Sequence, residues 1–167
     1  MKAIFALALI MTGIMPPMQN YDLPEIRRLY NRAPFSKDDA LLLFTLLQPV
    51  ESTSLPLLNC YKGAADLMQA KYALNPLDKI EDFNLGKSRI TAAFNRDSLN
   101  LEMHFIRFSI QNNLPSFLGY NGDLDNDKRF ILTRIKACPD MVLKHMILNY
   151  LSTSGVSIPQ DLKRKSN

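Results

Sequence analysis

The sequence predicts an all-α fold of about seven helices arranged as antiparallel hairpins. No stretch shows the sustained apolar–polar alternation that is typical of a half-buried strand. Apolar residues instead recur three and four positions apart, and Pro, Gly and Asn turn signals fall at helix-length intervals. We expect one helical domain over residues 21–155, because a chain of this length buries most of its apolar surface around a single core.

The first two helices are marked by turn and cap residues. The first should begin near Pro24 and end near Ala33. Ser36 is a typical N-cap for the second, since acidic residues follow in the first turn. Residues 40–47 are almost continuously apolar, so we expect this helix to be central, and Pro49 ends it.

The next two helices form a predicted hairpin. Ser54 is expected to cap the first, which runs to about Leu74, and its small residues 63–65 should let a neighbouring helix approach closely. Asn75-Pro76 then stops this helix and starts the next, which ends near Arg96. The apolar positions of that helix are Leu77, Ile80, Phe83, Ile90 and Phe94.

Three further helical segments complete the domain. Residues 101–113 are apolar on two sides, which predicts an interior helix. The connection 114–126 that follows is long for a helical bundle, and such loops are often functional. Residues 128–138 should be helical, and Pro139 starts a last helix that Gly155 caps.

The first twenty residues are typical of a signal peptide. Lys2 precedes thirteen uncharged and almost wholly apolar residues, 3–15, whereas a helix needs about 20 to cross a bilayer. A buried N-terminal helix is the alternative, but such a helix normally carries a polar face. We therefore expect residues 1–20 to be a signal peptide cleaved between Gly13 and Asn20, and an exported protein of the periplasm or cell envelope that meets the membrane only through this peptide.

The charge of the chain comes from its two ends. There are 20 basic and 16 acidic residues, and the excess consists of Lys2 and of Lys163, Arg164 and Lys165 in the polar basic tail, 156–167. Patches that bind anionic lipid use about 4–8 clustered cations. We therefore expect no nucleic-acid partner and read the tail as a solvated end.

Two cysteines, Cys60 and Cys138, lie far apart in apolar surroundings. Two interpretations stay open. They are small buried core residues, or they form a Cys60–Cys138 disulfide, which an oxidising compartment would permit.

The sequence predicts no metal site and no cofactor. Acidic residues at 123, 125 and 127 are spaced like the start of a calcium loop, but the positions that need Gly and Glu hold Lys128 and Arg134. His104 and His145 lack the companions of a zinc motif. No serine or cysteine lies in a nucleophile motif such as GxSxG.

Part of the chain resembles a tetratricopeptide unit. Its first helix is matched by Tyr61, Ala64, Ala65 and Met68. Its second helix is matched by Gly86, Ile90, Ala93 and Asp97-Ser98, and the next opening by Phe105, Phe108 and Ser109. The connection 75–85 is too long for the standard period, and the pattern fades after Asn113. The resemblance implies an irregular α-solenoid with one tetratricopeptide-like unit and flanking helices.

Residues 57–131 are also similar to an uncharacterised family of exported bacterial helical proteins of the Bacteroidetes type. The similarity is carried by Tyr61-Lys62-Gly63-Ala64, Ala70-Lys71, Asn75-Pro76, Gly86-Lys87, Arg107-Phe108, Gln111, Asn113, Phe117-Leu118-Gly119-Tyr120 and Asp127-Lys128. It implies export and a helical fold, and it implies no activity.

Polar residues on the otherwise apolar helix 101–113 are candidates for binding. Polar side chains on the first helices of repeat proteins line a concave face, and Arg can grip a carboxylate at two points. The alternative is that these residues cap helix ends and hold the 114–126 loop. The candidate residues are Arg107, Gln111, Asn113 and Tyr120, with Lys62 and Lys71 as weaker ones.

These observations favour a non-enzymatic binding or scaffold protein that contacts a protein or peptide. One alternative is a small-molecule binder or enzyme with a pocket near His104 and Tyr120. Another is a purely structural component of the envelope.

Overall fold

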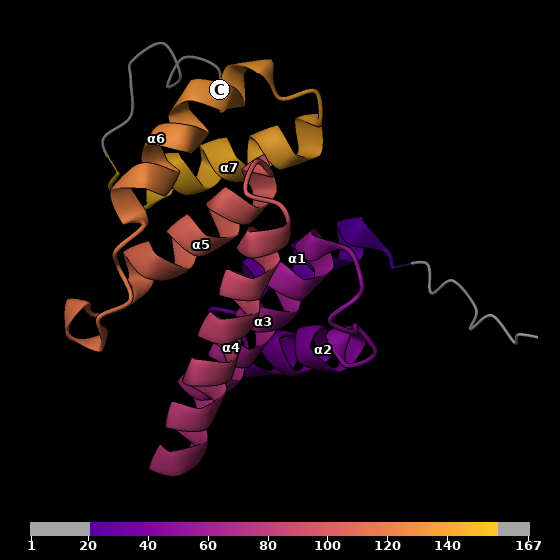
Figure 1. Ribbon diagram of the computed structural model, residues 1–167, viewed down its shortest axis with the longest axis vertical. Coiled ribbons are helices and arrows are strands. Elements are labelled where there is room, and N and C mark those ends of the chain that lie inside the picture. The colour runs from indigo at the N-terminus through magenta and orange to yellow at the C-terminus, as the bar shows by residue number, and fades with distance from the viewer. Residues whose placement is uncertain (1–20, 157–167) are drawn as a thin grey trace, which may run out of the picture.

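The structure, a computed structural model, describes residues 21–156, which hold helices and no strand. The expected signal peptide and residues 157–167 of the tail lie outside the described residues. The helices are α1 (Leu23–Arg32), α2 (Lys37–Leu47), α3 (Pro56–Tyr72), α4 (Pro76–Arg96), α5 (Leu101–Asn113), α6 (Leu124–Arg134) and α7 (Met141–Thr153), with 3₁₀ turns at Ser116–Leu118 and Ile135–Ala137 (Figure 1). The prediction of an all-α fold with about seven helices is confirmed.

Short polar side chains start most of these helices. The Oδ1 atom of Asn75 accepts from the Leu77 N–H at 3.0 Å, and Asn100 caps α5 in the same way. Asp140 accepts from the Leu143 N–H at 3.0 Å at the start of α7. Because Asn75-Pro76 supplies both a cap and a first-turn proline, the predicted bounds of α4 match the observed ones.

Several local expectations were wrong. Helix α7 begins at Met141 after its cap Asp140, and not at Pro139. Ser54 does not cap α3, because its hydroxyl accepts from the Glu51 N–H instead. Helix α2 is not central, since Leu41 and Leu42 are more than half exposed. The connection after α5 is shorter than expected because α6 already begins at Leu124, where the acidic residues lie in its first turn.

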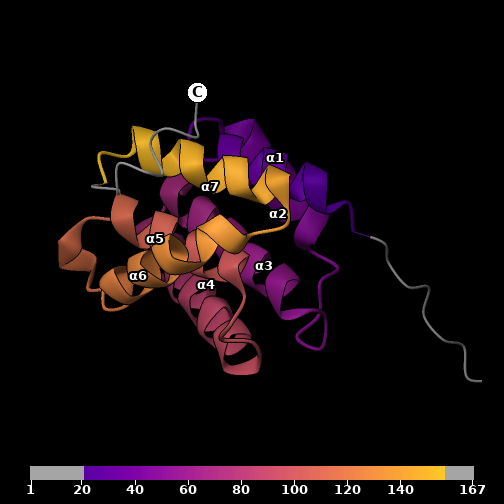
Figure 2. The same cartoon turned by 90° about the horizontal axis from the view of Figure 1, so that it is seen from above.

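Helices α3 and α4 form a tight hairpin around two glycines, and they lie side by side in Figures 1 and 2. A Cβ atom added to Gly63 would lie 2.7 Å from the Gly86 carbonyl oxygen, and one added to Gly86 would lie 2.6 Å from the Gly63 carbonyl oxygen. The predicted close approach at residues 63–65 is therefore present. Only glycine allows these two backbones to touch.

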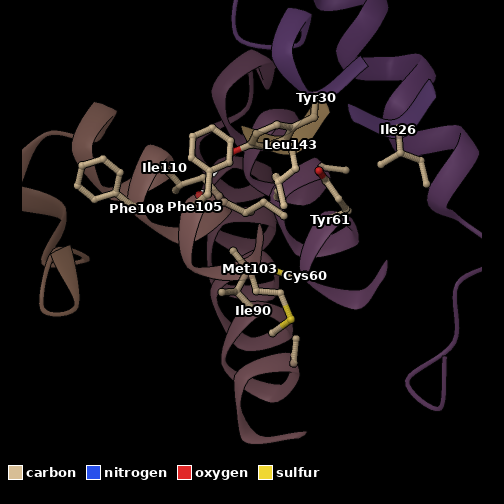
Figure 3. Close-up of a cluster of buried hydrophobic side chains, with 14 of the residues drawn as sticks. Ile26, Tyr30, Cys60, Tyr61, Ile90, Met103, Phe105, Phe108, Ile110 and Leu143 are labelled. Carbon is tan, nitrogen blue, oxygen red and sulfur yellow. Dashed lines mark hydrogen bonds between the residues drawn. The ribbon is translucent and has the colours of Figure 1, made fainter. Parts of the chain in front are cut away.

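One apolar core connects the helices. Its side chains include Tyr30 of α1, Tyr61 of α3, Ile90 of α4, Phe105 of α5 and Leu143 of α7, all labelled in Figure 3. Helix α5 contributes buried side chains on several sides, which confirms that it is interior.

A buried ion pair lies within this core. The guanidinium of Arg27 donates to both carboxylate oxygens of Glu102, at 2.7 and 2.6 Å, and to Asp140 at 2.8 Å. The Tyr61 hydroxyl donates to Glu102 at 2.5 Å. Four helix segments are therefore joined by one hydrogen-bonded cluster, which fixes how α1, α3, α5 and the start of α7 sit together.

Candidate functional site

The structure turns the predicted binding residue Arg107 inward. Its Nε and Nη2 atoms donate to the two oxygens of Asp127 at 2.7 and 2.8 Å, and its guanidinium lies 3.7 Å from the centre of the Phe94 ring. Asp127 is fully buried. The two-point grip expected for a ligand carboxylate is therefore made to a carboxylate of the chain itself.

His104 belongs to the same buried cluster. Its Nδ1 atom lies 2.5 Å from Asp127, and its Nε2 atom lies 3.0 Å from the Ser98 carbonyl oxygen. The ring stacks on Phe130 at 3.6 Å. Both nitrogens face acceptors of the chain, so neither is placed to take a proton from a substrate.

Gln111 and Tyr120 each bury polar atoms that have no partner. Gln111 is 2% exposed, and both its amide nitrogen and its amide oxygen lack a hydrogen bond within the described chain. The Tyr120 hydroxyl is buried without a partner as well, and this burial raises its pKa. Asn113 is satisfied, since it donates to the Ser109 carbonyl and the Tyr150 hydroxyl at 2.7 and 2.8 Å.

The two lysine candidates hold neighbouring backbone in place. Lys62 donates to the carbonyl oxygens of Gln48 and Val50 at 2.8 and 2.6 Å, just after the end of α2. Lys71 donates to the Pro34 carbonyl at 2.5 Å. The six candidate residues therefore do not gather on one surface.

Cys60 and Cys138 are both buried, and no disulfide joins them in this structure. Burial raises the pKa of the Cys60 thiol, so it is a poor nucleophile. Residues 21–156 contain no group of three His, Cys, Asp or Glu side chains that could hold a metal ion.

A different surface stands out, on the first half of α4. No side chain between residues 76 and 85 is buried, whereas Gly86, Ile90 and Ala93 in the second half are. Helix α4 packs on α3 and makes only slight contact with other helices. Its first half forms the lower end of the molecule in Figure 1, away from α5, α6 and α7.

Large apolar side chains are exposed on this half. Leu77 is 73% exposed and Ile80 is 60% exposed, and Leu74 just before the helix is 95% exposed. Helical spacing places Leu77, Ile80 and Phe83 on one side. Phe83 is half-buried and packs edge-on against Tyr120, with ring centroids 6.2 Å apart. We call Leu77, Ile80 and Phe83 the α4 apolar face.

One edge of the α4 apolar face is acidic. Glu81 and Asp78 lie beside Leu77 around the helix and form this edge, whereas Asp82 and Lys79 lie on the side that continues toward α3. Partial burial and the negative charges of Asp78 and Glu81 raise the pKa of Asp82. Asp78 and Glu81 therefore place negative charge on this edge.

Helical periodicity alone does not reveal this surface. Leu77 and Ile80 fit a helix over residues 76–96, but the periodicity does not say which side a neighbour covers. A usable signal is the register. Counting back three and four from the buried Gly86 leads to Phe83 and Asp82, which are half-buried, and then to Lys79, so Leu77 and Ile80 lie off the side that faces α3.

Comparison with protein-family models, with curated proteins and with solved structures found no match. Across the part of the chain that the structure describes, every helix is too short or too polar to span a membrane.

Proposed function

We propose that this chain is a non-enzymatic, exported helical binding protein that uses the α4 apolar face to bind a basic amphipathic helix of a partner protein. The exposure of Leu77 and Ile80 on a regular helix carries the proposal. Apolar side chains that gather on one exposed side of a helix are typical of protein contact sites, whereas scattered ones need no explanation.

The apolar face can supply useful binding energy. Burial of a Leu or Ile side chain from full exposure is worth about 1.5–3 kcal/mol. Leu77 and Ile80 keep most of that exposure in the free chain. Covering both should therefore contribute about 2–4 kcal/mol to the binding free energy, which is roughly a 30- to 1,000-fold gain in affinity.

The acidic edge selects the charge of the partner. Glu81 and Asp78 would lie beside a segment packed along Leu77 and Ile80. Lysine or arginine on that segment would pair with these two carboxylates. A second copy of this chain would bring the same acidic edge, so the charges favour a basic partner over self-association.

A synthetic amphipathic peptide with leucine on one face and lysine on the other is the probe for this site. We expect fluorescence anisotropy to show micromolar binding to the wild-type chain. The double variant L77S/I80S should bind at least tenfold more weakly. The matched variant L41S/L42S, which removes two exposed leucines from α2, should bind as the wild type does.

Charge gives a second readout on the same surface. The variant E81K should weaken binding of the lysine peptide and strengthen binding of a glutamate peptide with the same apolar face. Equal loss of binding in both double variants would contradict the proposal, because it would show that the peptide binds exposed apolar side chains wherever they lie. Unchanged binding in every variant would also contradict it, because the peptide would then bind elsewhere on the chain.

Export is part of the proposal and has its own test. It rests on the apolar residues 3–15, their length and the prolines that follow. Expression in a Gram-negative host followed by N-terminal sequencing of the periplasmic fraction should find a mature chain that starts between Gly13 and Asn20. An uncleaved chain in the cytoplasm would contradict it.

One observation favours the small-molecule alternative. The Gln111 amide and the Tyr120 hydroxyl are buried without partners, and buried polar groups normally have them. Replacing Gln111 with Leu separates the two cases. If the amide binds no molecule, Q111L should raise the melting temperature. If a metabolite panel raises the melting temperature of the wild type but not of Q111L, the small-molecule function takes precedence.

A further inference from the structure

A groove on the other side of the α3–α4 hairpin is lined by cations. It has a volume of about 200 Å³ and lies between the 50–52 segment, α3 and α4. Lys62 from α3 and Arg89 and Arg96 from α4 line it, with Ala92 on the wall between the arginines. The α4 apolar face lies outside this lining, so the groove is a separate surface.

Neutral carbonyl groups position two of these cations. Lys62 donates to Gln48 and Val50, and Arg96 donates to the carbonyl oxygens of Ser52 and Thr53 at 2.6 and 3.2 Å. A carbonyl fixes the direction of a cation but does not cancel its charge. Lys62 thus uses two of its three N–H donors and Arg96 two of its five, which leaves donors for a ligand.

Two carboxylates offset part of this charge. Arg89 pairs with Asp66 through one N–H at 2.5 Å, and Asp66 is buried behind it. Glu51 acts on Lys62 as well, so three cations and two carboxylates leave one positive charge uncompensated. Burial and then the charge of Arg89 lower the pKa of Lys62, whereas Asp66 and Glu51 act in the opposite direction.

We propose that this groove binds an oxyanion such as a phosphate group. Lys62, Arg89 and Arg96 line it from both helices, and guanidinium groups match the oxygens of a phosphate at two points. The net positive charge of the groove favours such an anion. This site does not depend on the partner proposed for the α4 apolar face.

An NMR titration of the full chain with inorganic phosphate tests the site. At constant ionic strength, we expect phosphate to shift the backbone amides of residues 50–53, 59–62 and 89–96 in a saturable way. Sodium chloride should not shift them. The variant A92E places a carboxylate on the groove wall without removing any hydrogen bond, and it should weaken phosphate binding at least tenfold.

The variant N149E is the matched control. Asn149 is exposed and lies four residues before the end of α7, as Ala92 lies four residues before the end of α4. N149E should bind phosphate as the wild type does. Shifts spread over the whole surface, shifts equal to those caused by chloride, or equal loss in both variants would overturn the proposal.

A second arm identifies the source of the phosphate group. Titration with glycerol 3-phosphate compares a phosphate ester with the free ion. Tighter binding of the ester supports a site for a phosphate carried by a larger molecule, and equal binding supports a site for the free ion.

Discussion

At the scale of single residues, Gly63 and Gly86 set the distance between α3 and α4. The Cβ atom of an alanine at position 86 would lie 2.6 Å from a carbonyl oxygen and 2.7 Å from the Cγ atom of Leu67. Real Cβ atoms do not approach backbone so closely, so the hairpin would have to open. The sequence signal for this contact is a glycine on each of two neighbouring helices.

The variant G86A should therefore lose about 1–3 kcal/mol of unfolding free energy, even though alanine favours a helix more than glycine does. Urea denaturation followed by circular dichroism measures it. The control is G122A, because a Cβ atom at Gly122 meets nothing within 4 Å. Wild-type stability in G86A would show that α3 and α4 do not touch as described.

Glu102 shows how burial changes the contribution of an ion pair to the stability of the fold. Its carboxylate is held by Arg27 and Tyr61 in the core, whereas Glu25 makes the same two-point pair with Arg28 at the surface. E102Q should destabilise the fold by about 3 kcal/mol, because it leaves the buried guanidinium without its main counter-charge. E25Q should have no measurable effect on urea denaturation. Equal effects in the two variants would contradict the burial of Glu102.

At the scale of helices, Asp140 connects α7 to α1. It accepts from the Leu143 N–H and pairs with Arg27, and these contacts hold its pKa below the usual value of about 3.9. A lowered pKa of an acid gives stability that is present above the unfolded pKa and is lost as the pH falls through the folded value.

The variant D140N tests this linkage because asparagine still caps the helix but carries no charge. Between pH 5 and pH 2 the unfolding free energy of the wild type should fall more steeply than that of D140N. At neutral pH the wild type should be the more stable of the two. Parallel curves would show that Arg27 does not lower the pKa of Asp140 in the folded protein.

Helix bounds could be predicted where a cap and a proline coincide, as at Asn75-Pro76. The helix bounds were missed where the expected cap residue forms a different hydrogen bond, or where acidic residues favour an earlier start of the helix. Ser54 bonds to the Glu51 N–H and so cannot cap α3, and the acidic residues before Lys128 start α6 earlier than expected. Such outcomes depend on hydrogen bonds a few residues away, which spacing alone does not rank.

The candidate site was harder to predict than the fold. The sequence marks Arg107 as a residue able to grip a carboxylate, which it does, but its partner Asp127 lies in the next helix and reaches it only through the path of the 114–123 loop. The sequence does not distinguish Leu77 and Ile80 from the other apolar positions of the helix. Their exposure follows from α4 having one substantial neighbour, which is a property of the assembled helices.

At the scale of the whole molecule, the helices divide into a buried centre and two exposed surfaces on the α3–α4 hairpin. Polar residues that the sequence suggests for binding, such as Arg107 and Lys71, hold the chain together. The surfaces left for partners are the α4 apolar face with its acidic edge and the cationic groove. Opposite charges on the two surfaces would let one hairpin bind two different ligands.

Hydrogen–deuterium exchange of the chain with and without the leucine–lysine peptide shows where the peptide binds. We predict that the peptide slows exchange in residues 76–85 and leaves α7 and the 50–52 segment unchanged. Protection centred on another helix, or binding that leaves residues 76–85 unprotected, would contradict the assignment of the α4 apolar face as the partner site.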